Sequence, residues 1–212
     1  MYARTVGGQP LLFQVSGKLW GDSLVMRDDR TGSEWSHILG TCVAGKLKDT
    51  KLKLVPSIIT SWKSWRESHP HTTVSVLSRT APEFNVDMYD QPDGFLVGLR
   101  HGGEVVAYPL AELLEHPVIN DTVGDEPIVV AYDPKETGAM IFRRTLDDAV
   151  IDFDAQDGDF TGGGSRWNRT TGIALDGPHK GKRLLRLSAI LSFANAWRRF
   201  HPNARIYRHA EP

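Results

Sequence analysis

The sequence predicts an α+β fold that is mainly antiparallel β-sheet, with one main helix per half and an internal duplication. Short apolar runs bounded by Gly, Asp and Pro dominate the 212-residue chain, and such runs are typical of strands. One stretch, "SWKSWRESHP" at 61–70, recurs as "FANAWRRFHP" at 193–202. A composition that is 40% hydrophobic and 24% charged is typical of a globular protein with a core.

The recurrence keeps one spacing over a long stretch. The pairs of identical residues that lie 132 positions apart include Trp35 and Trp167, Gly40 and Gly172, Gly45 and Gly177, Leu52 and Leu184, Trp65 and Trp197, His69 and His201, and Pro70 and Pro202. Residues 2–13 resemble 142–153 in the same way, at an offset of 140. An ungapped match over roughly forty residues indicates an internal duplication.

The expected elements follow in order along the chain. Strands are predicted at 11–15, 24–26, 52–55, 73–77, 95–99, 104–108 and 127–132. Helices are predicted at 57–69, 109–115 and 188–201, where apolar residues fall at helical spacing. Ser57 and Ser188 are candidate N-caps, and Pro70 ends the first helix. Pro109 suits the first position of the short helix.

The two halves are expected to be unequal. We predict a first, incomplete repeat at 1–80, a polar linker with two prolines at 81–94, and a second, complete repeat at 95–212. Residues 93–141, called the central block below, have no counterpart in the first repeat. The first repeat therefore needs a cover for its sheet, either the central block itself, another copy of the chain or a different subunit.

Charge is spread unevenly, although the net charge is −1. Residues 81–159 carry 18 Asp and Glu against 4 Lys and Arg, a local charge of −14, whereas 179–209 carry 8 Lys and Arg and no acid. We expect these two segments to contact each other. The near-neutral total argues against nucleic acid as a partner, and the absence of a long apolar stretch argues against a membrane span.

Several stretches together resemble a known family. They are "FQVSGKLWGDSLVMRDDRTGSEWSHILGTCVAGKL", "TSWKSWRESHP", "VLSR" and "EVVAYPLAELLEHPVINDTVGDEPIVVAY". The chain is similar over nearly its whole length to the prokaryotic domain of unknown function 3179. This resemblance implies no established activity, and it suggests an exported or envelope-associated protein, which the residues themselves do not indicate.

The chain departs from that family's usual pattern in one respect. Members usually begin with an extra block that contains a Cys-Pro-Leu-Cys-like or Cys-Pro-Leu-Thr-like element, and that block is absent here. At the equivalent place in the second repeat, Asp133 occupies the cysteine position. A thiol-based redox or metal role is therefore unsupported. Cys42, the single cysteine, is expected to be a small buried side chain.

The strongest polar group is "HPVINDTVGDEP", with His116, Asn120 and Asp121, joined by Asp133 on the next predicted strand. A histidine beside carboxylates suits general acid–base catalysis or a divalent metal. The structural alternative is that His116 lies at the negative end of helix 109–115, and that Asn120 and Asp121 bond backbone amides in a turn.

A second group lies around "HPH". His69 and His71 are a weak metal pair, because no third ligand accompanies them in this stretch. His116 is a further weak metal candidate. The repeat favours a histidine packed beside an indole and bonded to backbone, and core packing for Trp62 and Trp65. "TGGGSRW" at 161–167 is expected to be a turn, since it lacks the ending of a phosphate loop.

The sequence thus favours a non-catalytic binding or assembly module that works through protein–protein contacts, as a homo-oligomer or a subunit of a larger assembly. No cofactor is predicted. The alternative is an enzyme or metal-binding protein with a site around His116, Asn120, Asp121 and Asp133.

Overall fold

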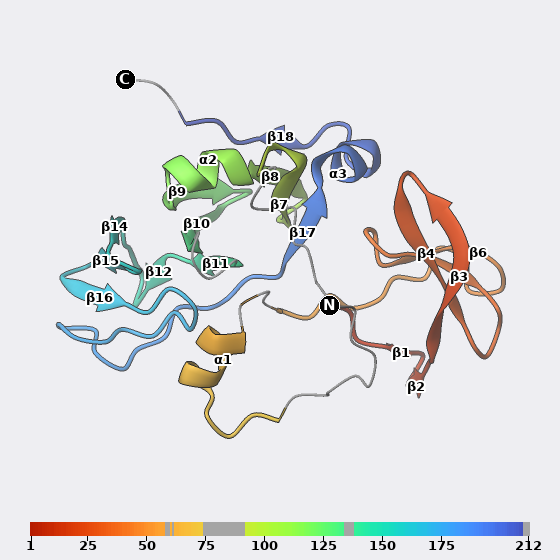
Figure 1. The fold of residues 1–212 in the computed structure, drawn as a ribbon, viewed down its shortest axis with the longest axis horizontal. Coiled ribbons are helices and arrows are strands. Elements are labelled where there is room, and N and C mark those ends of the chain that lie inside the picture. The colour runs from red at the N-terminus through yellow and green to blue at the C-terminus, as the bar shows by residue number, and fades with distance from the viewer. Residues whose placement is uncertain (58–59, 61, 74–91, 134–137, 210–212) are drawn as a thin grey trace.

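Antiparallel sheets dominate the chain in a computed structural model, which describes residues 1–57, 60, 62–73, 92–133 and 138–209 (Figure 1). The N-terminal strands are β1 (Thr5–Val6), β2 (Gln9–Pro10), β3 (Phe13–Trp20), β4 (Ser23–Asp28), β5 (Glu34–Ser36) and β6 (Thr41–Ala44). The central strands are β7 (Phe95–His101), β8 (Glu104–Pro109), β9 (Val118–Val123), β10 (Glu126–Asp133) and β11 (Gly138–Arg143). The C-terminal strands are β12 (Thr145–Leu146), β13 (Ala149–Val150), β14 (Asp154–Gln156), β15 (Asp159–Gly162), β16 (Ser165–Trp167), β17 (Ala189–Phe193) and β18 (Arg205–Ile206). The helices are α1 (Trp62–Ser68), α2 (Leu110–Glu115) and α3 (Ala194–Phe200), with a 3-10 turn η1 at Pro92–Gly94.

The strands form two sheets of four and two sheets of three, with orders β3-β4-β5-β6, β17-β7-β8-β18, β11-β10-β9 and β14-β15-β16. Strands β1 with β2 and β12 with β13 make short hairpins, and β18 joins β8 in parallel. The predicted α+β class is therefore supported as a β-rich, mostly antiparallel fold with few helices.

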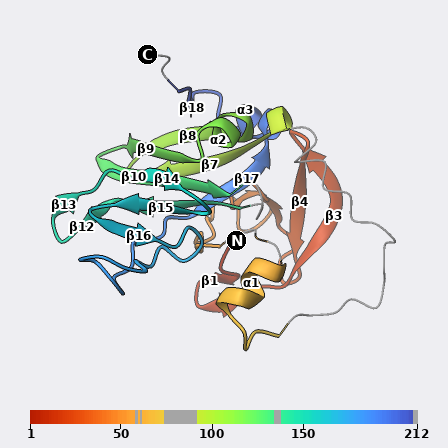
Figure 2. The same ribbon diagram turned by 60° about the vertical axis from the view of Figure 1, so that its left-hand side comes forward.

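Strand β10 lies between two hydrophobic cores and packs against both. Its alternate residues Ile128 and Val130 pack with side chains of β7 and β8, while Val129 and Ala131 pack on the other face with Phe160 and other aromatic side chains of the C-terminal strands. Figure 2 shows the sheets β17-β7-β8-β18, β11-β10-β9 and β14-β15-β16 stacked, with β9 and β10 in the middle layer. A strand buried on both faces reads as a continuous apolar run, which is why "PIVVAY" shows no alternation.

The N-terminal segment (residues 2–73) and the C-terminal segment (residues 142–205) repeat the same pairings at the offsets seen in the sequence. Three pairs recur: Trp35 with Cys42 and Trp167 with Ala174, Thr41 with Lys51 and Ile173 with Arg183, and Tyr2 with Leu54 and Phe142 with Arg186. Backbone hydrogen bonds recur in the same way. The amide of Leu52 donates to the carbonyl of Gly40, and the amide of Leu184 donates to the carbonyl of Gly172. The two segments therefore follow one local plan.

Two glycines show why this plan needs specific residues. Gly40 and Gly172 both have a positive φ, of 64° and 68°. A Cβ on Gly40 would lie 2.3 Å from the Tyr2 ring, and a Cβ on Gly172 would lie 2.6 Å from the Phe142 ring. At both positions an aromatic ring fills the place of a side chain, so only glycine fits.

The equivalent indoles Trp35 and Trp167 are fully buried but find different hydrogen-bond acceptors. Trp35 Nε1 donates to the Asp28 carboxylate at 3.0 Å, whereas Trp167 Nε1 donates to the backbone carbonyl of Gly162 at 3.0 Å. Asp28 is only 2% exposed. Burial raises its pKa, but hydrogen bonds from Trp35, Thr31 and a backbone amide outweigh burial and bring the pKa below its ordinary value.

Helix α3 joins three parts of the chain. Its Trp197 is completely buried, and the indole lies against Gly98 of β7. The same apolar cluster contains Leu96 and Ala107 of the central block and Ile38 of the N-terminal segment. The central block thus covers part of the N-terminal segment, which is one of the three covers that the sequence allowed.

Several predicted elements are different in the structure. The helix predicted at 188–201 is wrong in its first half, because residues 189–193 form strand β17 and pair with β7. Pairing with a neighbouring strand overrides the helical periodicity there. Residues 52–55 form no strand, and only Leu54 among them makes an isolated bridge, to Tyr2. The first helix covers 62–68 within the predicted 57–69. Residues 74–77 of the strand predicted at 73–77, and the linker up to residue 91, lie outside the described residues.

The acidic and basic segments contact each other within the chain, as expected. Arg205 pairs with Glu104 at 3.0 Å and with Asp121 at 3.0 Å, and Lys182 pairs with Asp147. Glu104 also accepts a bond from the amide of Gly124 at 2.7 Å, which together with Arg205 lowers the pKa of Glu104.

Gly98→Ala is expected to destabilise the protein, because the new Cβ would lie 2.3 Å from the Trp197 ring. Overpacking of this kind typically costs about 1–3 kcal/mol in the free energy of unfolding, measurable by urea denaturation. Gly94→Ala is the matched control, since nothing lies within 4 Å of its Cβ. Its effect should stay within about 0.5 kcal/mol. Equal effects of the two variants would contradict the packing described for Trp197.

The stabilising effect of Asp28 should depend on pH. Because the folded-state pKa of Asp28 is lowered, its contribution is present above the unfolded value of about 3.9 and is lost as the pH falls through the folded value. Asp28→Asn should lower the free energy of unfolding at neutral pH. On acidification, the variant should lose less of this free energy than the unmodified protein. Urea denaturation at pH 7 and at strongly acidic pH measures both. An unchanged acid loss in the variant would show that Asp28 titrates normally.

Candidate functional site

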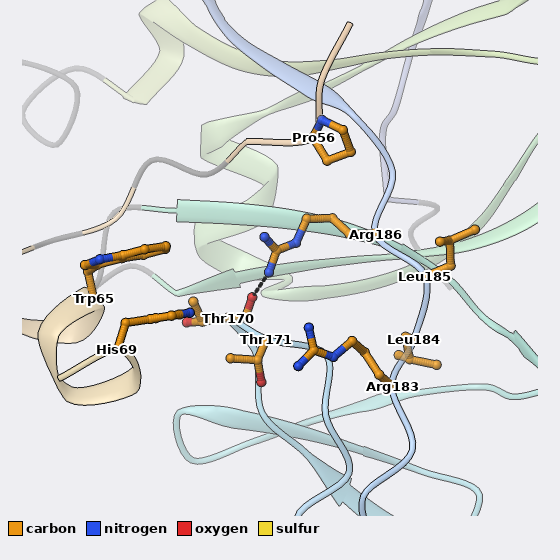
Figure 3. A pocket seen from close by; sticks show the side chains of 9 residues that line it. All are labelled: Pro56, Trp65, His69, Thr170, Thr171, Arg183, Leu184, Leu185 and Arg186. Carbon is orange, nitrogen blue, oxygen red and sulfur yellow. Dashed lines mark hydrogen bonds between the residues drawn. The ribbon is translucent and has the colours of Figure 1, made fainter. Parts of the chain in front are cut away.

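A cleft of about 390 Å³ lies between α1 and the C-terminal segment (Figure 3). Residues far apart in sequence line it: Pro56, Trp65, His69, Thr170, Thr171, Arg183, Leu184, Leu185 and Arg186. None of these described lining residues is Asp or Glu. The cleft therefore has two cationic side chains and no carboxylate in its described wall.

The two arginines extend from the segment before β17 toward the loop at 170–171, as Figure 3 shows. Arg186 donates to the backbone carbonyl of Thr170, and its guanidinium lies over the Phe142 ring at 5.7 Å from the centroid. Burial, and then the positive charge of Arg183, lower the pKa of Arg186. In the described part of the chain, neither arginine has an ion-pair partner within 4.0 Å. The two neighbouring guanidinium groups therefore carry positive charge that no described carboxylate compensates.

On the opposite side, α1 contributes a stacked pair. The rings of Trp65 and His69 are parallel within 7°, with centroids 4.0 Å apart. This confirms the predicted histidine beside an indole, but not the predicted bond from imidazole to backbone. The Nδ1 atom of His69 is buried and has no hydrogen-bond partner.

The two threonines differ in their availability. The Thr171 hydroxyl is engaged with the Asn168 amide oxygen at 2.9 Å. The Thr170 hydroxyl makes no hydrogen bond with the described residues, although the carbonyl of Thr170 is held by Arg186. Thr170, His69, Arg183 and Arg186 therefore present polar groups to the cleft from three separate stretches of chain.

The N-terminal segment contains a place equivalent to this cleft. We call it the filled place, because apolar side chains occupy it. Ile38 is the counterpart of Thr170 at the 132-residue offset, and it packs in the cluster of Trp197, the counterpart of Trp65. The Ile38 carbonyl accepts a bond from Tyr2 at 2.7 Å, whereas Arg186 supplies this bond to Thr170.

The residue types at the two places differ systematically. At the offset of 132, Ile38, Leu39 and Leu54 correspond to Thr170, Thr171 and Arg186 of the cleft, and Lys51 corresponds to Arg183. Three aliphatic side chains are thus replaced by polar or charged ones in the wall of the cleft. This difference indicates that the open cleft is suited to water or a polar ligand, not to apolar packing.

The sequence-predicted site residues do not meet at one place. His116 lies at the C-terminal end of α2, as the structural alternative predicted, and its ring stacks on His209 with centroids 3.7 Å apart. Asn120 bonds both backbone groups of Phe153, at 2.8 and 3.0 Å. The predicted turn at 120–121 is wrong, since both residues belong to strand β9.

Asp121 points away from Asn120, because neighbours on a strand face opposite sides. Its carboxylate accepts bonds from the Tyr108 hydroxyl at 2.7 Å and from Arg205 at 3.0 Å. Burial and the bond to Asp121 raise the pKa of Tyr108. The network ties β8, β9 and β18 together, which is a structural contact.

Asp133 lies at the end of β10, where it lines a different depression with Arg169 and Gln156. Arg169 is buried and donates to the backbone carbonyls of Tyr132 and Asp159. Asp133 therefore contributes to another surface than His116, Asn120 or Asp121.

The remaining candidates divide between the core and the surface. Cys42 is buried, as predicted, and burial raises its pKa. His71 is exposed, and Trp62 is 43% exposed, so the prediction of core packing is wrong for Trp62. The turn predicted at 161–167 is confirmed by the hairpin between β15 and β16. Among the described residues, no three His, Cys, Asp or Glu side chains come close enough to hold a metal ion.

Sequence reasoning missed Thr170, Arg183 and Arg186. A signal was present in the repeat itself, since each of these positions could have been compared with its counterpart at the offset of 132. That comparison reveals a change from aliphatic to polar at two of the three positions. The residues that are identical between the repeats are mostly in cores and turns.

The fold and the cleft define a β-rich protein with a recurring structural plan and a cationic surface hollow. The chain belongs to the family described as protein of unknown function DUF3179, whose model matches it in two overlapping segments, residues 1–90 and 79–211. No curated protein matches the chain, and no solved structure matches it. No described helix is both long and apolar enough to span a membrane.

Proposed function

We propose that this chain is a non-catalytic binding protein, built from two copies of one structural unit, that takes up a small anionic ligand in the cleft beside α1. The observation that carries the proposal is the pair Arg183 and Arg186, which face a cleft without a carboxylate in its described wall. A bound anion would relieve the repulsion between the two guanidinium groups and would gain charge-assisted hydrogen bonds.

The recurring pairings support the two-copy architecture. Cross-strand pairs, backbone hydrogen bonds and glycines with positive φ recur at the same offsets of 132 and 140 residues. The family model also matches in two segments. Duplication followed by divergence accounts for the difference between the filled place around Ile38 and the open cleft around Thr170.

The side chains that the sequence offered for acid–base catalysis are engaged in other contacts, which supports the proposal that the protein is non-catalytic. Asn120 is occupied by the backbone of Phe153, and Asp121 is occupied by Tyr108 and Arg205. His116 stacks on His209. The alternative of an enzyme or metal-binding site around these residues and Asp133 has less support, because their side chains serve separate contacts.

Removal of Arg183 should weaken anion binding without unfolding the protein, because this side chain is exposed and makes no described ion pair. Isothermal titration calorimetry with acetate and with phosphate should show a loss of about tenfold or more for Arg183→Ala. Lys51→Ala is the matched control, since Lys51 is the exposed counterpart of Arg183 at the offset of 132. An equal loss in both variants would contradict a specific role of the cleft, and absence of binding by the unmodified protein would refute the proposal.

We also propose that the chain associates with further copies of itself. Strand β3 is an edge strand that is paired with β4, yet Leu12, Val15 and Leu19 on it and beside it are 52%, 72% and 73% exposed. An exposed apolar edge favours pairing with another strand. Light scattering should show a concentration-dependent increase in mass that the double variant V15K/L19K abolishes. A monomer at every concentration would refute self-association.

A further inference from the structure

We infer that the ligand of the cleft is a small organic phosphate monoester, held through its phosphoryl group. This inference rests on the proposed function and specifies the ligand class.

The polar groups approach from three stretches of chain. Arg183 and Arg186 come from the segment before β17, Thr170 comes from the loop after β16, and His69 directly follows α1. Figure 3 shows the two guanidinium groups and the His69 ring converging on the two threonines from different sides. A planar carboxylate is satisfied by one guanidinium fork in its own plane. A tetrahedral phosphoryl group has three terminal oxygens in three directions, which matches this arrangement.

Two of the groups are unused by the protein. Nδ1 of His69 is buried without a hydrogen-bond partner, and buried polar atoms are normally paired. The Thr170 hydroxyl also has no hydrogen bond to the described residues, while the neighbouring Thr171 hydroxyl is satisfied by Asn168. The Thr170 hydroxyl lines the cleft, whereas Nδ1 of His69 is enclosed by protein. A carboxylate on the arginines would leave the Thr170 hydroxyl unpaired, and the third oxygen of a phosphoryl group would pair it.

The cleft also has room and apolar surface for more than an inorganic ion. Its volume of about 390 Å³ lies within the range of small-molecule sites, about 300–1,000 Å³. Trp65 and Leu185 line it beside the polar groups, and Leu185 is 56% exposed. These side chains would cover the organic part of the ligand, which an inorganic phosphate ion lacks.

The test compares two ligands that share a ring and differ in the anion. Phenyl phosphate and benzoate are titrated into the full chain by calorimetry, with inorganic phosphate as a third probe. We expect phenyl phosphate to bind about tenfold or more tightly than benzoate, and more tightly than inorganic phosphate. Thr170→Val should reduce the affinity for phenyl phosphate and leave that for benzoate unchanged, and Lys51→Ala should change neither.

The outcomes separate this inference from the proposed function. If benzoate binds as tightly as phenyl phosphate and Arg183→Ala weakens both, the site is a general anion site and only the phosphoryl inference fails. If inorganic phosphate binds as tightly as phenyl phosphate, the organic part of the inference fails. If none of the three binds, the inference and the proposed function fail together. The comparison of ligands uses the unmodified protein, so it holds even if Thr170→Val does not fold.

Discussion

The burial of Trp197 of α3 against Gly98 of β7 is the contact on which the arrangement of the chain depends. The indole fills the place of a side chain on the central strand, and Ile38 of the N-terminal segment joins the same cluster. One aromatic ring therefore holds together the N-terminal segment, the central block and the C-terminal segment. Buried aromatic side chains contribute large apolar areas, and a site without a Cβ lets the ring approach the backbone closely.

The same contact explains why the cleft exists. Helix α1 carries Trp65 in the position that Trp197 has in α3, but the strands β7 and β8 pack against α3. Trp65 stacks on His69 instead and remains at the wall of a hollow. Polar residues at 170, 171 and 186 are compatible with a wet surface, whereas Ile38, the aliphatic counterpart of Thr170, is buried in the core around Trp197. The two places therefore differ in chemistry where they differ in burial.

Electrostatics connects the acidic segment 81–159 to the basic segment 179–209 without making the cleft neutral. Arg205 is used by Glu104 and Asp121, and Lys182 by Asp147. Exposed pairs of this kind contribute little each, typically below about 1 kcal/mol, so their main effect is on orientation. Arg183 and Arg186 have no ion-pair partner in the described chain, although they belong to the same basic segment. Local geometry, and not the total charge, decides which cations are available for a ligand.

The sequence by itself determined the local plan of this protein. The offsets of 132 and 140 residues located equivalent tryptophans, glycines and histidines, and the apolar runs located β7, β8 and β10. Such features depend on residues near each other along the chain. Tertiary structure alone decided that 189–193 is a strand, because a partner strand from residues 95–99 pairs with it. It also decided that Asn120 and Asp121 serve different contacts and that Thr170, Arg183 and His69 share a cleft. Those outcomes depend on which distant segments pack together, and periodicity carries no information about that.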